Sequence, residues 1–191
     1  MTDAVIVLDM LEDFVTGVLG TDRARNVIPT LSDELLPAAR EHGIRVVYAN
    51  DSHLPEDTEL DLWGEHAMRG TGGAEVIEDL TPEEGDDVFE KRFYDGFHET
   101  GLDEHLRSLG VDRVIITGLH THMCCRHTAA SAFFHGYDIA VPADCVDAFT
   151  QEDHERGLEY LEGTYGAEIT TAGELVAEWE AATRAVAGGD E

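Results

Sequence analysis

Short runs of apolar and β-branched residues recur along the chain, and helical spacing fills most of the intervals between them. Runs of this length and composition are typical of buried strands. We expect strands at 5–9, 44–50, 87–91, 113–118, 137–142 and 167–171. Helical spacing covers 21–42, 99–109, 124–135, 151–163 and 172–187. Because strands alternate with helices, the pattern predicts an α/β fold: a mainly parallel, doubly wound sheet with helices on both faces.

The chain of 191 residues has room for one such domain, and a second large domain would not fit. We place the domain at 1–187 and expect a frayed tail at 188–191. The long exception to the alternating pattern is 51–73, which is rich in Gly, Asp, Glu and His. Loops longer than about 12–15 residues in a compact domain are often functional, so this segment is a candidate for part of a site.

Acidic residues dominate the charge balance. There are 41 acidic and 12 basic residues, a formal net charge of −29. Nucleic acid is therefore not an expected partner. Repulsion on this scale strains a compact fold in dilute buffer but is screened in molar salt, where the Debye length falls to about 3 Å. We interpret the chain as a halophile's protein.

Location and cysteine use point to the cell interior. The chain enters strand-like sequence at Ala4 without a signal segment, and its longest apolar stretch is far below the roughly 18 residues that suggest a membrane span. We expect a cytoplasmic homo-oligomer that binds a small molecule and no membrane. Three cysteines, an odd number without CxxC spacing, favour neither a disulfide framework nor a thiolate zinc site.

Three predicted strand ends carry chemically useful side chains. The first strand ends at Asp9, the third ends at Lys91, and the fourth runs through a turn to Cys124, where a helix begins. Parallel strands deliver their carboxyl ends to one edge, where ligands bind. Lys91 is the only lysine beside 11 arginines. A helix N-terminus and a nearby ammonium favour a thiolate, while a carboxylate can move its proton, so this set suits nucleophilic catalysis.

Each residue alone has a simpler interpretation. Asp9 can cap the turn after its strand, Cys124 can be a buried thiol, and a lysine at a strand end is usually a surface charge. The combination of all three at one edge is what favours catalysis.

Three segments resemble the signature regions of the isochorismatase-like cysteine hydrolases: VLDMLEDFV (7–15), EKRFYDGFHETGLDEHL (90–106) and TGLHTHMCCRHTAASAFFHGY (117–137). The resemblance spans nearly the whole chain. It implies a catalytic triad of Asp9, Lys91 and Cys124, with Cys125 as a packed thiol. Family members without the cysteine are isochorismate hydrolases, so Cys124 implies an amidase.

The resemblance also implies a cis peptide before position 120 and an oxyanion hole made by the backbone amides of His120 and Cys124. Two residues depart from the family pattern. His120 replaces a small residue, and His122 stands where an aspartate is usual. Since neither position belongs to the triad, the chemistry should survive while the pocket wall changes.

A second constellation lies in the long loop. Asp51, His53 and His66 resemble the metal site of nicotinamidases, with Glu59 as a further ligand. Two imidazoles and a carboxylate suit zinc, and also iron or manganese. Without the resemblance, an Asp-x-His pair in an acidic loop is more often a solvated turn.

The resemblance therefore implies a nicotinamidase that forms nicotinate and ammonia through a thioester. Phe14 and Trp63 are the expected aromatic walls of its pocket. Two alternatives remain open. The same triad can act on another small amide, a carbamoyl or ureido compound, and the His120 and His122 departures keep this alternative open. A non-catalytic metal or thiol redox module would use Cys124 and Cys125 as a sensor, but it leaves Asp9 and Lys91 unexplained.

Overall fold

A seven-stranded parallel sheet forms the centre of the protein. The computed structural model describes residues 1–187, so the tail expected at 188–191 lies outside the described residues. The strands lie in the order β3-β2-β1-β4-β5-β7, and β6 pairs with β4. Every pairing between these strands is parallel, which confirms the predicted fold class. The strands are β1 (Asp3–Leu8), β2 (Arg45–Asp51), β3 (Asp87–Lys91), β4 (Arg113–Leu119), β5 (Asp138–Pro142), β6 (Val146–Asp147) and β7 (Glu168–Thr170).

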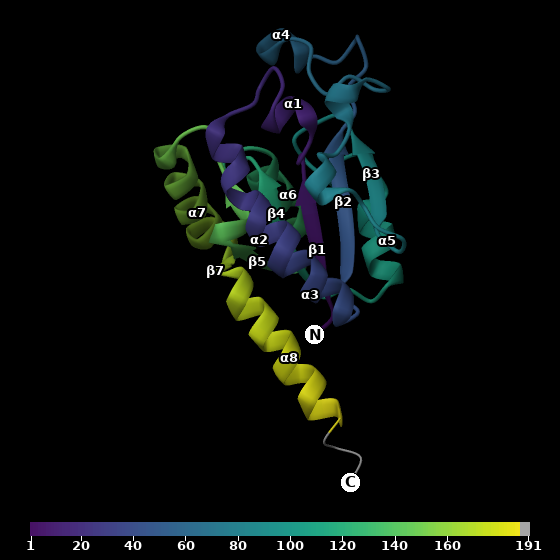
Figure 1. Cartoon of the computed structure of the whole chain (residues 1–191), viewed down its shortest axis with the longest axis vertical. Helices are drawn as coiled ribbons and strands as arrows, with labels where there is room; N and C mark the ends of the chain where they lie inside the picture. The colour runs from purple at the N-terminus through teal and green to yellow at the C-terminus, as the bar shows by residue number, and fades with distance from the viewer. Residues whose placement is uncertain (188–191) are drawn as a thin grey trace.

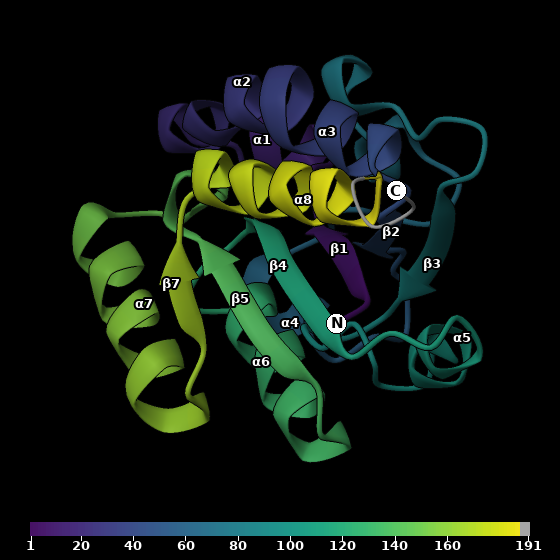
Figure 2. The ribbon, with the colours of Figure 1, turned by 90° about the horizontal axis from the view of Figure 1, so that it is seen from below.

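Helices cover both faces of the sheet (Figure 2). On one side lie α2 (Ile28–Thr30), α3 (Leu36–Glu41) and α8 (Ala172–Ala187). The other side carries α5 (Leu102–Ser108), α6 (Cys124–His135) and α7 (Gln151–Tyr165). The short α1 (Glu12–Val15) and α4 (Leu60–Trp63) follow the first two strands. Single-turn 3₁₀ segments occur at Gly72–Ala74, Glu78–Leu80 and Ala143–Cys145.

Alternate residues of β1 separate the two cores. Val5 and Val7 pack with the residues of α3 and α8, including Trp179. Ile6 and Leu8 pack with the opposite group, which includes α5, α6 and α7. Since successive strand residues point to opposite faces, the continuous apolar run of β1 is the pattern of a strand buried on both sides.

The helix expected at 21–42 is divided. A 3₁₀ segment (Asp22–Val27) leads into α2, a π-helical turn (Leu31–Leu35) follows, and α3 completes the run. Pro29 and Pro37 lie inside this stretch, and proline has no N–H with which to continue an α-helical hydrogen-bond ladder. The helical spacing was correct, but the prolines prevent a single α-helix.

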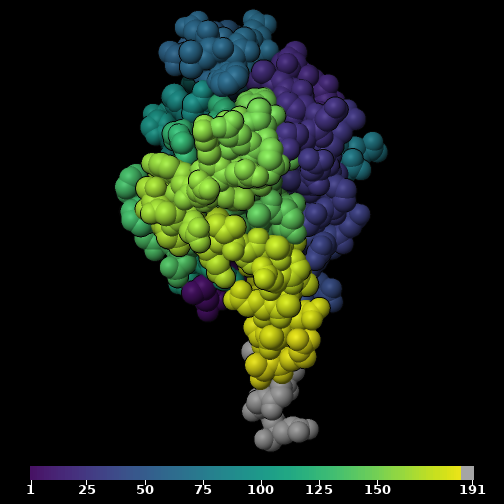
Figure 3. Space-filling model, turned by 90° about the vertical axis from the view of Figure 1, so that its left-hand side faces the viewer, coloured from purple at the N-terminus to yellow at the C-terminus, as the bar shows by residue number. Residues whose placement is uncertain are grey.

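The carboxyl ends of the strands lie at one edge, opposite the N-terminus, and α1 and α4 stand over them (Figure 1). The loop expected at 51–73 contains α4 and projects at that edge as a knob on the molecular surface (Figure 3). No helix within residues 1–187 combines the length and apolarity needed to cross a membrane.

Candidate active site

Four buried side chains converge at the carboxyl edge of the sheet. Asp9 follows β1, Asp51 ends β2, Lys91 ends β3 and Cys124 begins α6. Asp51 and Lys91 are register partners. Each of the four is at most 3% exposed. The structure therefore brings the predicted triad together and adds Asp51, which the sequence suggested only as a metal ligand.

Lys91 contacts the other three members of this group. Its Nζ lies 2.8 Å from Asp9 Oδ2, donates to Asp51 Oδ1, and lies 3.8 Å from Cys124 Sγ. Burial disfavours the ammonium, but the two carboxylates outweigh burial and hold the pKa of Lys91 well above its usual value. The amine is therefore a permanent cation beside the sulfur.

The surroundings of the Cys124 thiol do not favour ionisation in the resting site. Burial and the negative charge of Asp9 raise the pKa of Cys124 well above its usual value, and Asp51 adds to the effect. Lys91 acts in the opposite direction, but its charge is shared between two carboxylates. The raised pKa favours the neutral thiol in the resting site, so the proton has to leave as the sulfur attacks.

Asp9 has the properties of the group that takes that proton. Its backbone is in the left-handed region (φ 53°), which aspartate tolerates better than most residues. Its Oδ1 accepts a hydrogen bond from the Asp51 amide at 2.8 Å, and its own amide donates to Asn50 Oδ1 at 3.2 Å. Burial and the charge of Asp51 raise the pKa of Asp9 to about 6, which makes this carboxylate a stronger base than an ordinary aspartate.

The turn between β4 and α6 contains the two backbone amides that the resemblance assigns to an oxyanion hole. The Leu119–His120 peptide bond is cis, as the resemblance implied. Within the described residues, the amides of His120 and Cys124 donate no backbone hydrogen bond, whereas the amides of Thr121, Met123 and Cys125 do. Both expected donors are therefore available to a substrate oxygen near Cys124 Sγ.

Gly118 allows the end of β4 to lie close to Leu8, the residue before Asp9. Its φ is +94°, and an added Cβ would stand 2.0 Å from the Leu8 carbonyl oxygen. Only glycine fits such a close approach between β4 and β1.

Cys125 packs away from the reaction edge. It is fully buried in the core beneath α6, and its Sγ lies 3.9 Å from the Thr117 carbonyl oxygen. Burial raises its pKa strongly, so it has the character of a packed, unreactive thiol.

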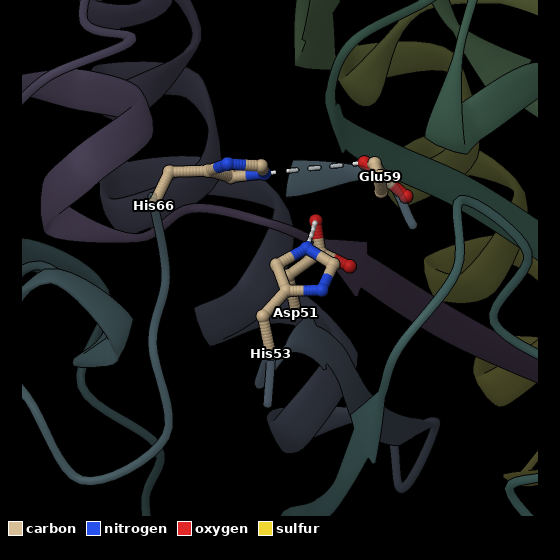
Figure 4. A group of neighbouring side chains, drawn as sticks. All are labelled: Asp51, His53, Glu59 and His66. Atoms are coloured by element: carbon tan, nitrogen blue, oxygen red, sulfur yellow. Dashed lines mark ion pairs between the residues drawn. The ribbon is translucent and has the colours of Figure 1, made fainter. Parts of the chain in front are cut away.

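The four expected metal ligands form one cluster. One ligand atom from each of Asp51, His53, Glu59 and His66 lies within 4.8 Å of the others, and all four residues are buried. Figure 4 shows the side chains converging on a common space. Asp51 Oδ2 and His53 Nε2 are buried without a hydrogen-bond partner among the described residues. A donor set of two imidazoles and two carboxylates with unpartnered buried atoms fits a divalent cation.

Hydrogen bonds at Nδ1 orient the imidazoles of His53 and His66 toward the centre of the cluster. His53 Nδ1 lies 3.1 Å from Asp57 Oδ2, and His66 Nδ1 lies 2.8 Å from the Gly64 carbonyl oxygen. Each contact occupies Nδ1 and leaves Nε2 facing the cluster. In metal sites, a histidine ligand commonly makes such a hydrogen bond through the ring nitrogen that does not bind the metal. Arg92 donates to Asp57 and holds the pKa of that carboxyl well below its usual range. The sequence reasoning missed Asp57 and Arg92.

Burial shifts the pKa values of two residues of the cluster, Glu59 and His66. It raises the pKa of Glu59 to about 7, with a contribution from Asp51, and it lowers the pKa of His66. A neutral His66 at neutral pH is the form that binds a metal ion.

A pocket opens onto Cys124 and onto Asp51, Glu59 and His66 of the cluster. Phe14 and Trp63 line it as expected. Trp63 donates from Nε1 to the Tyr94 hydroxyl at 2.9 Å and stacks on Phe149. The sequence did not indicate the other wall residues: Leu19, Tyr94, Met123 and Phe149.

The two departures from the family pattern differ in position. His120 lines the pocket and is 2% exposed, with its ring stacked on Phe149 at a centroid distance of 4.0 Å. His122 is partly exposed and is not a wall residue of this pocket.

Comparison with known proteins decides the family. Residues 3–174 match the model of the isochorismatase domain. The chain belongs to the isochorismatase family. It spans 61% of the length of the first curated relatives that it matches, which are 28% identical over 174 residues.

Three solved isochorismatase-family relatives bear on the site. N-carbamoylsarcosine amidase from Thermoplasma acidophilum is 39% identical, with a TM-score of 0.85, over 90% of this chain and 97% of that one. A nicotinamidase from Bacillus subtilis is 31% identical, with a TM-score of 0.83, over 89% and 100%. Pyrazinamidase of Pyrococcus horikoshii, solved in complex with zinc, is 30% identical, with a TM-score of 0.81, over 90% and 99%. By their names, these relatives are hydrolases of amide bonds.

Proposed function

We propose that this chain is a cysteine amidohydrolase for a small amide, with nicotinamide as the first candidate substrate. The observation that carries the proposal is the contact of a buried acid, amine and thiol at the wall of a pocket. That same pocket is lined by two members of the four-residue cluster besides Asp51: Glu59 and His66. Amidases and nicotinamidases among the solved family relatives support it.

The reaction follows from the positions of the side chains. Cys124 Sγ attacks the amide carbon while its proton passes to Asp9, and the amides of His120 and Cys124 hold the oxygen that becomes negative. Asp9 returns the proton to the departing nitrogen, and ammonia leaves an acyl thioester on Cys124. Asp9 then takes a proton from water as the water attacks the thioester, which releases the carboxylic acid and restores the thiol. Lys91 keeps Asp9 in place and offsets negative charge on sulfur.

Asp51, His53, Glu59 and His66 are the residues that would hold a divalent ion, and zinc, iron and manganese all suit the donor set. Zinc is our first choice because a relative of 30% identity binds it. When bound, the ion would supply a Lewis-acid contact for a polar atom of the substrate, such as the pyridine nitrogen of nicotinamide.

Ammonia release from a panel of amides at high salt tests the proposal. Nicotinamide should exceed benzamide, which has the same shape without the ring nitrogen, by up to about 10⁴-fold in kcat/KM. Chelation or His53→Ala should remove most of that difference. Equal turnover of the two amides, indifferent to chelators, would refute nicotinamide recognition at the cluster.

A second candidate, a carbamoyl or ureido amide, is favoured by the 39% identity to N-carbamoylsarcosine amidase and by the polar wall that His120 forms. The same panel separates the two, because each candidate predicts a different best substrate. A protein that releases ammonia from no amide in the panel would contradict the amidase proposal itself.

A further inference from the structure

His120 lines the pocket beside Cys124, and its imidazole nitrogens have no role in the reaction proposed above. Its side chain lies beside Cys124 in the pocket lining and is 2% exposed. Its backbone amide belongs to the proposed oxyanion hole, but the imidazole has no part in the reaction described above.

Neither ring nitrogen has a hydrogen-bond partner among the described residues. Three rings surround it: Phe149 stacks on it at 4.0 Å between centroids, Phe14 meets it at 6.1 Å with an interplanar angle of 73°, and His122 lies at 6.3 Å without a hydrogen bond to it. These rings restrict the plane of the imidazole, and none of them makes a hydrogen bond to its nitrogens. A buried polar group left unpaired costs stability equivalent to about ten- to hundredfold in an equilibrium constant.

This lack of partners is not general among the histidines of the chain. A ring nitrogen lies within hydrogen-bond distance of a partner in His42, His53, His66, His105 and His154. Burial lowers the pKa of His120 to about 4, so the ring is neutral at neutral pH. A neutral imidazole presents one N–H donor and one acceptor. The pocket therefore contains a pair of complementary polar groups, fixed in orientation and buried.

Phe14 also contacts His66, a member of the four-residue cluster. The Phe14 ring meets His66 at 5.5 Å and His120 at 6.1 Å between centroids, edge to face in both cases. A substrate bound over Cys124 thus has two separate polar features to meet, the cluster and His120. Benzamide has a group for neither, and nicotinamide has one ring nitrogen.

We propose that His120 is a specificity-determining residue whose imidazole hydrogen-bonds a polar substituent of the substrate, distinct from the amide that is cleaved and from any atom that faces the cluster. The favoured class is a small amide with an additional N–H, carbonyl or carboxylate group. This inference rests on the proposed amidase function.

The test compares His120→Phe with His120→Gln in the full chain at high salt. Phenylalanine keeps a flat ring against Phe149 without nitrogens, whereas glutamine keeps a neutral donor and acceptor. The readout is the ratio of kcat/KM for N-carbamoylglycine to kcat/KM for benzamide. His120→Phe should lower this ratio by about ten- to hundredfold, and His120→Gln should restore much of it. An equal loss for both amides would make His120 merely structural and overturn the proposal.

A binding measurement separates this inference from the proposed reaction. In Cys124→Ala protein, which cannot form a thioester, N-carbamoylglycine should shift the ring ¹⁵N resonances of His120. A shift in a protein whose parent hydrolyses no amide would sustain the His120 contact and refute the amidase proposal. Turnover by the parent, with no shift at saturating ligand, would mean that water alone satisfies the ring and would overturn the inference.

Discussion

Asp51 is the residue at which the two halves of the site meet. One carboxylate oxygen accepts from Lys91, while the other is buried and faces His53 Nε2 at 3.6 Å. The same side chain therefore balances the charge of the amine beside the sulfur and belongs to the cluster. The sequence suggested two independent constellations, but a shared carboxylate couples the environment of the thiol to whatever the cluster binds.

The adjacent cysteines give the clearest test of the assigned nucleophile. Cys124→Ala should lower amide turnover by at least about 10⁴-fold, because the attacking atom is lost. Cys125→Ala should keep most of the turnover and lose about 1 kcal/mol of stability, because it removes a packed sulfur from the core. Ammonia release and urea unfolding measure the two effects. An active Cys124 variant beside an inactive Cys125 variant would reverse the assignment.

His120 should also make the protein sensitive to mild acid. Burial lowers the pKa of His120 from 6.5 in the unfolded chain to about 4 in the native protein. Between these two pH values the unfolded chain therefore binds a proton that the native protein does not bind. Stability associated with the neutral ring is complete above pH 6.5 and is lost as the pH falls toward 4. The loss should reach about 2 kcal/mol near pH 5.

Urea unfolding of the parent and His120→Phe, near pH 7.5 and near pH 5, measures this contribution. The variant should lose about 2 kcal/mol less than the parent between the two conditions, since phenylalanine takes up no proton. Identical acid sensitivity in both proteins would show that His120 is not buried as a neutral ring.

Sequence position alone identified the residues that lie at strand ends. Asp9, Lys91 and Cys124 could be placed together because parallel strands end at one edge. Asp57 and Phe149 could not, since their contacts depend on the path of loops and not on any periodic spacing. The raised pKa of the Cys124 thiol could not be predicted from the sequence either, because it depends on burial and on the nearby charge of Asp9.

At the scale of elements, periodicity predicted the main strands and most helices, but not the interruptions. The two-residue strand β6 is too short to have a period, yet it pairs with the end of β4 beside the oxyanion turn. The order of strands in the sheet likewise depends on long-range pairing that the pattern does not contain. Local composition determines an element, whereas its neighbours depend on the packing of the whole chain.

Besides its apolar packing, α8 is linked to the sheet by a buried ion pair at the edge opposite the site. Arg113 donates to both Asp3 oxygens at 2.9 and 2.7 Å, and Trp179 of α8 donates to Asp3 Oδ2 at 2.7 Å. Arg113→Met should cost about 3 kcal/mol or more, because it leaves the carboxylate of Asp3 buried without its cation.

Arg184→Met is the matched control, since Arg184 makes an exposed pair with Glu180 on the same helix. It should change the free energy of unfolding by less than about 0.5 kcal/mol. Amide turnover of the folded Arg113 variant should stay close to that of the parent, because Arg113 and Asp3 are the first residues of β4 and β1, at the edge opposite the carboxyl ends. A large loss of turnover without loss of stability would contradict this separation of fold and site.

At the scale of the whole molecule, the net charge of −29 predicts that folding requires salt. The charges are spread over the surface, and α7 alone exposes Glu155, Glu159 and Glu162. Repulsion among such charges reaches across about 10 Å in 0.1 M salt but only about 3 Å at 1 M. Dialysis from molar to dilute potassium chloride should therefore lower the melting temperature steeply and abolish turnover.

Replacement of Glu155, Glu159 and Glu162 by glutamine separates charge screening from other effects of salt. The triple variant removes three like charges, two of which lie four residues apart on one helix face, so its salt midpoint for unfolding should fall. The corresponding aspartate variant keeps the charge and should keep the midpoint of the parent. Two outcomes would contradict control of folding by charge repulsion. In one, sucrose at equal osmolality would stabilise the protein as well as the salt does. In the other, the glutamine and aspartate variants would have the same salt midpoint. Because screening does not depend on the cation's identity, sodium and potassium chloride should give the same midpoint within error.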